Sequence, residues 1–291
     1  MSIFHRLRNP CSWRNGVKQI PLDAIIPIFA VPLLAIIASK TIYTTLIVFV
    51  TCPIVVYHLH HNFLRFLPRS KFFLMWTITS VLMLMLVFEF CVVPLLEILP
   101  EENLVFIICV FGAIICGYKT RINTDKNCGN QDSTGLFDVA TGSEEASSRV
   151  YYCRICQTSI LGREYHCKWL DCCIGSSNLQ WYLTCCLLSA VAFIYGSNLT
   201  MTSVCHPFIL VGTVLLPDDC SDVYHQFDLA LCFVSSVYSL VIGIVVVGYL
   251  IYHSWLIFKG TTAHERRLNN SNTSSDNGVF NGLSQLVCCQ S

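Results

Sequence analysis

The sequence predicts an all-α polytopic membrane protein with about six transmembrane helices and a small Cys-rich cytoplasmic domain between helices 4 and 5. Two observations support this prediction. The chain has 291 residues, of which 54% are hydrophobic and only 12% charged, and this composition is too apolar for a soluble globular domain of that size. Its apolar residues also gather in runs close to the ~20 residues that a helix needs to cross a bilayer.

Six apolar runs have the length of membrane spans. They lie near 21–39, 42–58, 72–98, 103–118, 180–200 and 227–258. The first run starts beyond residue 20 and is followed by Ser39 and Lys40 rather than by a small-residue cleavage site. We therefore expect this run to stay in the protein as a helix and not to act as a cleavable signal peptide.

Positive charge is unevenly distributed among the predicted loops, although the net charge is zero. Lys and Arg residues gather before span one, between spans two and three, between spans four and five, and after span six, whereas Lys40 lies on the other side. Cytoplasmic loops carry such an excess of positive residues. Both termini are therefore expected in the cytoplasm, in a multi-pass protein of the endoplasmic reticulum, the Golgi or the plasma membrane.

This topology divides the chain into five parts. They are a cytoplasmic N-terminus at 1–20, four helices at 21–118, a cytoplasmic segment at 119–179 with its Cys-rich domain at 150–179, two helices with a lumenal loop at 180–258, and a cytoplasmic tail at 259–291.

Cysteines are expected to behave differently on the two sides of the membrane, because the cytosol keeps thiols reduced and the lumen permits disulfides. Cys205 and Cys220 flank the lumenal loop and could pair, although the sequence leaves this open. Cys288 and Cys289, in the cytoplasmic tail, could be lipidated or could be idle thiols.

The Cys-rich segment has the spacing of a metal site. Cys153 and Cys156 form a Cys-x-x-Cys turn, and His166 and Cys173 follow at gaps of nine and six residues. Zinc favours a tetrahedron of thiolates and imidazoles, so these four residues are predicted to hold one zinc ion. The alternative is that they are incidental cysteines near the membrane.

Cys167 is left outside this ligand set. It follows the metal-ligating His166, and Arg163 and Lys168 are close in sequence. Such surroundings favour a thiolate and raise its nucleophilicity. Spacing alone leaves a nucleophile and an inert or passively acylated cysteine as equal alternatives.

These residues resemble the zinc-dependent DHHC protein S-acyltransferases, whose Cys-rich domain carries Cys-x-x-Cys, an Asp-His-His-Cys block and a Pro-Trp-x-x-x-Cys-x-Gly-x-x-Asn run. Here the block reads Glu164-Tyr165-His166-Cys167, and the following run ends at Asn178. The resemblance implies that Cys167 takes an acyl group from acyl-CoA and passes it to a substrate cysteine. It also implies that the four predicted ligands hold the second of the family's two zinc ions.

Weaker resemblances follow the last span. Thr262-Ala-His-Glu265 is similar to the family's Thr-Thr-x-Glu element, and Asn281 follows an aromatic residue as an Asn does in the family's tail.

Two departures from the family pattern bear on function. The positions of the family's first zinc site read Val139, Gly142, Tyr152 and Ser159, so one zinc is expected rather than two. Tyr165 replaces the imidazole proposed as the family's base, which leaves Glu164 with no imidazole to orient. A phenol is a poor base at neutral pH, and losing a positioned base costs about 10²- to 10⁴-fold in rate.

The predicted function is therefore the transfer of a long-chain acyl group, such as palmitoyl, from acyl-CoA to cysteines of proteins at the cytoplasmic membrane face. The fatty chain would lie in the bilayer among the spans, and no nucleic acid is expected as a partner. Cations on the cytoplasmic rim would bind the CoA phosphates, although ordinary membrane topology also explains their presence. The candidates are Arg121, Lys126, Lys168, Arg266 and Arg267.

Two other classes remain open at this stage. A catalytically impaired scaffold or regulatory partner would fit Tyr165 and the degenerate first zinc site. A small transporter would fit Glu89 in the third span, because an ionisable residue inside a membrane usually faces a bundle interior or water. Glu89 could equally be protonated or hydrogen-bonded to a neighbouring helix.

Overall fold

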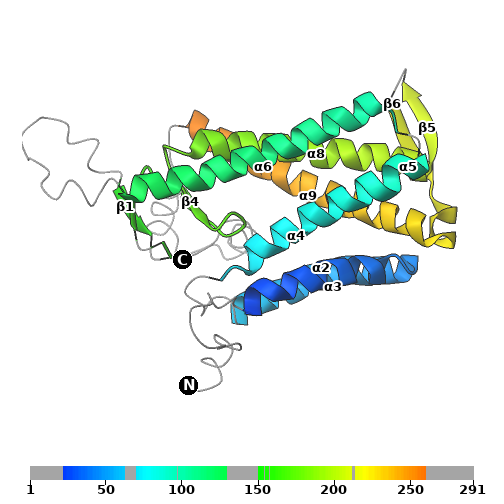
Figure 1. Cartoon of the computed structure of the whole chain (residues 1–291), viewed down its shortest axis with the longest axis horizontal. Helices are drawn as coiled ribbons and strands as arrows, with labels where there is room; N and C mark the ends of the chain where they lie inside the picture. Colours follow the sequence, from blue (N-terminus) through cyan, green and yellow to red (C-terminus); the bar gives the residue numbers. More distant parts are fainter. Residues whose placement is uncertain are drawn as a thin grey trace, which may run out of the picture. The chain divides into compact units, whose positions relative to one another are not determined.

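The computed structural model confirms a mostly helical membrane protein with a small stranded Cys-rich region (Figure 1). It describes residues 22–62, 70–96, 98–129, 150–153, 155–156, 158–211 and 214–259. Five of the helices in this described part are long and apolar enough to cross a bilayer: Ile42–Asn62, Phe72–Val92, Pro100–Thr124, Leu179–Val204 and Phe227–Phe258. The first predicted span forms a shorter apolar helix, α2 (Leu22–Ala38).

The outer faces of these helices are apolar. Phe29 of α2 is 71% exposed and Phe90 is 74% exposed, and many aliphatic side chains on the long helices are exposed as well. A soluble protein rarely exposes so much contiguous apolar surface. A bilayer solvates these side chains, and a helix leaves no backbone group unsatisfied in lipid.

The chain folds into two compact units. The first comprises residues 1–106 and 193–242, and the second comprises 107–192 and 243–291. In the first unit, α2 packs against both α3 (Ile42–Asn62) and α4 (Phe72–Val87). Asp23 of α2 accepts hydrogen bonds from the Ser70 hydroxyl and the Lys71 backbone N–H at 2.8 and 2.9 Å, which ties α2 to the start of α4.

The third predicted span is interrupted near its end. After α4 come a π-helical turn, η2 (Phe88–Val92), and a short helix, α5 (Val93–Leu96). Glu89 lies in this π turn, and its Oε2 accepts a hydrogen bond from Asn103 Nδ2 at 3.3 Å. Asn103 belongs to α6 (Pro100–Gly129). Of the two alternatives for Glu89, this contact favours hydrogen bonding to a neighbouring helix.

The predicted lumenal loop contains more structure than its sequence indicated. It forms an antiparallel hairpin of β5 (His206–Val211) and β6 (Val214–Asp219), followed by the 3₁₀ turn η3 (Ser221–His225). A disulfide joins Cys205 and Cys220 at the base of the hairpin. The pairing that the sequence left open is therefore present.

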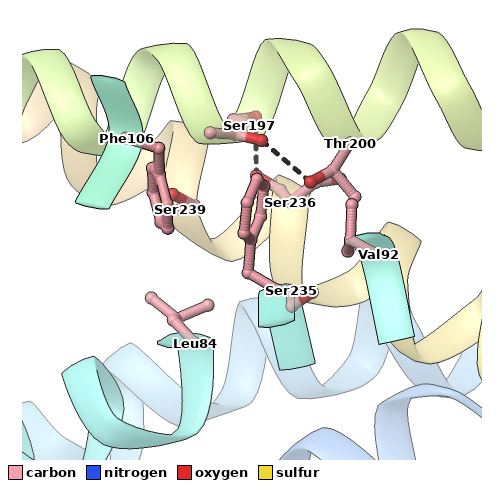
Figure 2. A pocket seen from close by; sticks show the side chains of 10 residues that line it. Leu84, Val92, Phe106, Ser197, Thr200, Ser235, Ser236 and Ser239 are labelled. Carbon is pink, nitrogen blue, oxygen red and sulfur yellow. Dashed lines mark hydrogen bonds between the residues drawn. The ribbon is translucent and has the colours of Figure 1, made fainter. Parts of the chain in front are cut away.

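A small cavity of about 20 Å³ lies in the first unit, enough room for about one water molecule. Ser197 and Thr200 of α8 (Leu179–Val204) and three serines of α9 (Phe227–Phe258) contribute to its lining. Figure 2 shows the Ser197 hydroxyl beside Ser236, whose carbonyl oxygen accepts its hydrogen bond at 2.8 Å. This contact ties α8 to α9 within the first unit.

Candidate metal centre and reactive cysteine

Two short antiparallel hairpins in the second unit carry the Cys-rich motif. The first pairs β1 (Val150–Cys153) with β2 (Thr158–Leu161), and the second pairs β3 (Tyr165–Cys167) with β4 (Cys172–Ile174). Gly162, with φ +58°, lies between the hairpins, where a left-handed backbone favours glycine. Asp171, with φ 49°, closes the turn before β4, and Asp is among the few other residues that tolerate this conformation.

The four predicted metal ligands converge on one point. Cys153 ends β1, Cys156 lies in the turn that follows, and His166 and Cys173 are direct partners across the β3–β4 hairpin. Their ligand atoms all lie within 4.8 Å of one another. Sulfur atoms around a tetrahedral zinc are separated by roughly 3.8 Å, as expected for Zn–S bonds of ~2.3 Å. The cluster therefore has the donor set and the spacing that suit one zinc ion.

Individual distances within the cluster agree with this reading. Cys156 Sγ lies 3.3 Å from His166 Nδ1 and 3.4 Å from Cys173 Sγ, and Cys173 Sγ lies 3.5 Å from His166 Nδ1. Hydrogen bonds from Cys156, which has the larger effect, and from Cys173 hold the pKa of Cys153 below the ordinary value of a thiol. Hydrogen bonds with Cys153 and Cys156 raise the pKa of Cys173. Crowded sulfur atoms that share protons in this way are well suited to a cation.

Asp171 lies behind the histidine ligand. Its Oδ1 is 3.9 Å from His166 Nε2, the ring nitrogen that points away from the other three ligands, and its Oδ2 is 3.7 Å from an Arg121 guanidinium nitrogen. Both Asp171 and His166 are almost completely buried. A carboxylate behind a ligating histidine is a recurrent feature of metal sites, because it fixes the ring and strengthens the nitrogen as a donor.

The alternation of side chains along β3 separates Cys167 from the metal ligands. Successive residues of a strand point to opposite faces, so His166 faces the ligand cluster while Tyr165 and Cys167 share the other face. On β4, Cys172 lies opposite Cys167 and Ile174 opposite Tyr165. These four side chains pack together in one buried cluster. The nucleophile candidate is thus adjacent in sequence to a predicted metal ligand but lies on the opposite face of the hairpin.

Burial sets the protonation of the groups around Cys167, which is itself only 4% exposed. Burial raises the pKa of the Cys172 thiol to about 12. Burial also raises the pKa of Tyr165 well above the ordinary value of a phenol. Tyr165 therefore remains protonated at neutral pH, as a hydrogen-bond donor and a very weak base.

An aromatic cluster surrounds Tyr165. Its ring lies 6.1 Å from Tyr182 of α8, 6.0 Å from Tyr249 of α9 and 5.5 Å from His253 of α9. The Tyr249 and His253 rings are 4.5 Å apart. The second unit therefore places an imidazole against the residue that replaces the family's usual imidazole.

Asn178 fastens the β3–β4 hairpin to α6. Its Nδ2 donates to the carbonyl oxygens of Cys173 and Thr120 at 2.9 and 3.1 Å and contacts Thr124 Oγ1 at 2.6 Å. Its Oδ1 accepts from the Gly175 backbone N–H at 2.9 Å. Asn178 is 1% exposed, so these bonds are shielded from water and hold the strand that carries Cys173.

The other predicted site residues have varied surroundings. Glu164 is buried, and Lys168 is half-buried in the turn after β3. Arg163 donates to the Tyr152 carbonyl oxygen at 2.9 Å and so bridges the two hairpins. The remaining predicted residues lie outside the described part of the chain: Thr262, Glu265, Arg266, Arg267 and Asn281.

The degenerate first zinc site is partly visible. Tyr152 and Ser159 are direct partners across the β1–β2 hairpin, whereas Val139 and Gly142 lie outside the described residues. Neither Tyr152 nor Ser159 offers a thiolate or an imidazole. Within the described ranges, the Cys153 cluster is the one group of Cys, His and acidic residues placed to hold a metal ion.

Sequence reasoning missed three contributors to the site. Asp171 lies two residues before a ligand, and its position within the Cys-rich block was the signal that could have identified it. His253 is an ionisable residue in an apolar helix, a pattern that itself indicates function. Thr124, whose hydroxyl donates to the Cys173 carbonyl oxygen at 2.9 Å, gave no sequence signal, because its contact spans 49 residues.

Comparisons with known proteins point to one family. Residues 141–270 match the profile of the DHHC palmitoyltransferase family. The chain is 25% identical to palmitoyltransferase ZDHHC23-B of Danio rerio over an alignment that covers 92% of this chain and 73% of the relative. It is 22% identical to palmitoyltransferase ZDHHC23 of Homo sapiens, covering 83% and 71%. A shorter alignment with palmitoyltransferase ZDHHC23-A of Danio rerio is 34% identical and covers 32% and 23%.

Proposed function

Because this chain belongs to the DHHC family of protein S-acyltransferases, we propose that it moves a long-chain acyl group from acyl-CoA to protein cysteines through an acyl-enzyme at Cys167. The observation that carries the proposal is the register of the β3–β4 hairpin. It pairs His166 with Cys173 on the face of the predicted ligands and Cys167 with Cys172 on the opposite face, which supports a role for Cys167 outside the ligand set. A nucleophile needs this separation, because a sulfur bound to zinc in a closed structural site is not available for attack.

Zinc would be held by Cys153, Cys156, His166 and Cys173, and it would supply structural cross-linking of the two hairpins. Such short hairpins have little core of their own, so metal binding contributes directly to their folding. Asp171 would orient the His166 ring from behind. In this way the backbone that carries Cys167 is fixed by groups that do not themselves react.

The acyl chain and the CoA moiety require different surroundings. Burial of the chain among apolar groups contributes about 0.8 kcal/mol per methylene, which favours a site at a bilayer. Lys126 and Lys168 are candidates within the described ranges for contact with the CoA phosphates, and Arg266 and Arg267 are further candidates from the sequence. Arg121 is less suited, because its guanidinium lies 3.7 Å from the Asp171 carboxylate.

The distribution of Lys and Arg favours a cytoplasmic location for the Cys-rich domain and both termini. Acyl-CoA and the substrate cysteines would then approach from the cytosol. Cys167 is only 4% exposed, so apolar side chains packed on its cluster must move when a thioester enters. Leu170 and Leu183 belong to this packing layer.

The experiment that tests this function is autoacylation of the purified full chain in detergent. We expect labelled palmitoyl-CoA to give a hydroxylamine-sensitive label that is lost in Cys167→Ser. The matched control is Cys172→Ser, because Cys172 lies directly opposite Cys167, is equally buried and belongs to the same cluster. This control should keep the label, and both variants should keep their zinc.

Three results would count against the proposal. Absence of Cys167-dependent label in a folded, zinc-loaded protein would favour a non-catalytic scaffold. This alternative is motivated by Tyr165, which stands where the family has an imidazole. Equal loss of label in the Cys167 and Cys172 variants would indicate general damage to the hairpin. Loss of zinc from Cys167→Ser would show that the ligand assignment is wrong.

A further inference from the structure

In the described part of the second unit, Tyr165 Oη and His253 Nε2 are among the buried side-chain atoms that have no hydrogen-bond partner, and their residues are 4% and 1% exposed. Leaving buried polar groups unpaired is unfavourable, and more than nine in ten of such groups in proteins are satisfied. Two orphaned atoms in one cluster therefore require an explanation other than stability.

One of these atoms belongs to the buried cluster that contains Cys167, and the other belongs to a side chain packed against that cluster. Tyr165 shares the strand face of Cys167 and packs in the same buried cluster. His253 lies against the Tyr165 ring, with ring centroids 5.5 Å apart and planes inclined by 33°. The Tyr249 ring packs beside His253, with ring centroids 4.5 Å apart and planes inclined by 48°.

A phenol O–H and an imidazole N–H are hydrogen-bond donors. Aimed at a developing negative charge in a dry site, such donors form an oxyanion hole, one of the strongest contributions to acyl transfer. Resting on the proposed function, we infer that Tyr165 Oη and His253 Nε2 donate hydrogen bonds to the thioester oxygen while Cys167 attacks. His253 acts in the tautomer that carries its proton on Nε2.

The step can be written with all bonds balanced. The Cys167 thiolate forms a bond to the thioester carbon, and the carbonyl π electrons move onto oxygen. Tyr165 and His253 stabilise this oxyanion without giving up their protons. When the carbonyl re-forms, the bond to the CoA sulfur breaks and CoA leaves as a thiolate. CoA takes one proton from solvent, which balances the proton that the Cys167 thiol released.

This role differs from that of the imidazole which Tyr165 replaces. A base would take the thiol proton, and it would speed every reaction of the Cys167 thiolate. Donors to an oxyanion speed only those reactions in which a carbonyl oxygen becomes negative. The residue at position 165 would therefore contribute to acyl transfer as a hydrogen-bond donor to the oxyanion and not as a general base.

This difference gives a direct test. The acylation rate of Cys167 with palmitoyl-CoA is compared with its alkylation rate by iodoacetamide, a displacement in which no oxyanion forms. Tyr165→Phe and His253→Phe remove one donor each and keep a ring in the cluster. Each is expected to slow acylation by about 100- to 1,000-fold, the usual cost of losing one oxyanion donor, while alkylation stays at the parent rate.

A conservative variant supplies the rescue. The Nε2 amide of Gln can replace the donor atom of the imidazole, so His253→Gln should recover much of the acylation that His253→Phe loses. The structural control is Tyr252→Phe, which keeps a ring against His253 but removes the hydroxyl of an exposed residue, and it should leave both rates unchanged. A merely structural role for His253 would change alkylation along with acylation and would not be rescued by Gln.

The outcomes separate this inference from the function on which it rests. A parent protein whose Cys167 is alkylated but never acylated overturns the proposed function. A parent protein that is acylated, with undiminished acylation in Tyr165→Phe and His253→Phe, overturns the oxyanion hole alone. Equal slowing of acylation and alkylation overturns it too, because that result identifies a base or a packing role.

Discussion

Replacement of Asn178 by Ala removes the side chain that joins the β3–β4 hairpin, which carries two of the predicted metal ligands, to α6. Its amide nitrogen contacts three acceptors and its oxygen accepts from the Gly175 N–H, all within the protein interior. Each net hydrogen bond contributes about 1 kcal/mol, and the stranded Gly175 N–H adds a desolvation penalty of about 1–3 kcal/mol. We therefore expect Asn178→Ala to lower the local stability of the hairpin by about 2–5 kcal/mol.

This loss should be visible as faster zinc release. Opening of the hairpin exposes the ligands, and each ~1.4 kcal/mol makes the open state about ten times more populated. The rate of zinc transfer from the purified protein to a chromophoric chelator should rise by more than about tenfold in Asn178→Ala, while the zinc content before transfer stays at one per chain. The matched control is Gln180→Ala, an exposed amide two residues along the chain.

Two results would refute this reasoning. If Asn178→Ala and Gln180→Ala released zinc at the same rate as the parent, the network would not limit opening of the hairpin. If Gln180→Ala released zinc as fast as Asn178→Ala, the effect would reflect disturbance of the first turn of α8 and not the loss of buried hydrogen bonds.

Two further predictions concern a tightly packed glycine and the disulfide, both in the first unit, with a glycine of the second unit as a control. Gly196→Ala would place a Cβ 2.7 Å from the Phe106 ring, so we expect a lower denaturation temperature from an overpacking cost of about 1–3 kcal/mol. Gly248→Ala is the control, because nothing lies within 4 Å of that position, and it should not lower the denaturation temperature. Equal decreases in the denaturation temperature of the two variants would contradict this account. The disulfide between Cys205 and Cys220 closes a 15-residue separation, so replacing both by Ser should cost about 3 kcal/mol. A non-reduced digest should contain the linked peptide, and its absence would show that the bond does not form.

The membrane fold could be predicted almost entirely from the sequence. In lipid, each spanning segment must satisfy its own backbone hydrogen bonds, so one-dimensional hydropathy determines where helices form. The predicted run at 42–58 became Ile42–Asn62, and the run at 180–200 became Leu179–Val204. The helix predicted at 103–118 extends from Pro100 to Gly129, because a helix can continue past the apolar core into polar sequence.

The strands could not be predicted in this way. The β5–β6 hairpin and the two Cys-rich hairpins are only three to six residues per strand, too short for a clear alternating pattern. A disulfide lies at the base of the β5–β6 hairpin, and the Cys153, Cys156, His166 and Cys173 side chains meet where the two Cys-rich hairpins come together. Spacing placed Cys153, Cys156, His166 and Cys173 in one group, and their ligand atoms do lie within 4.8 Å of one another, since zinc sites recur with recognisable gaps between Cys and His.

The sequence by itself determined the membrane class, the six helical segments and the Cys153, Cys156, His166, Cys173 grouping, because apolar runs and ligand spacing are local properties of a chain. Only the tertiary structure decided that His253 lies against Tyr165 and that Asn178 reaches α6. These contacts join residues 88 and 58 positions apart. Such distant pairs are set by how helices and hairpins pack, and no periodicity along the chain encodes them.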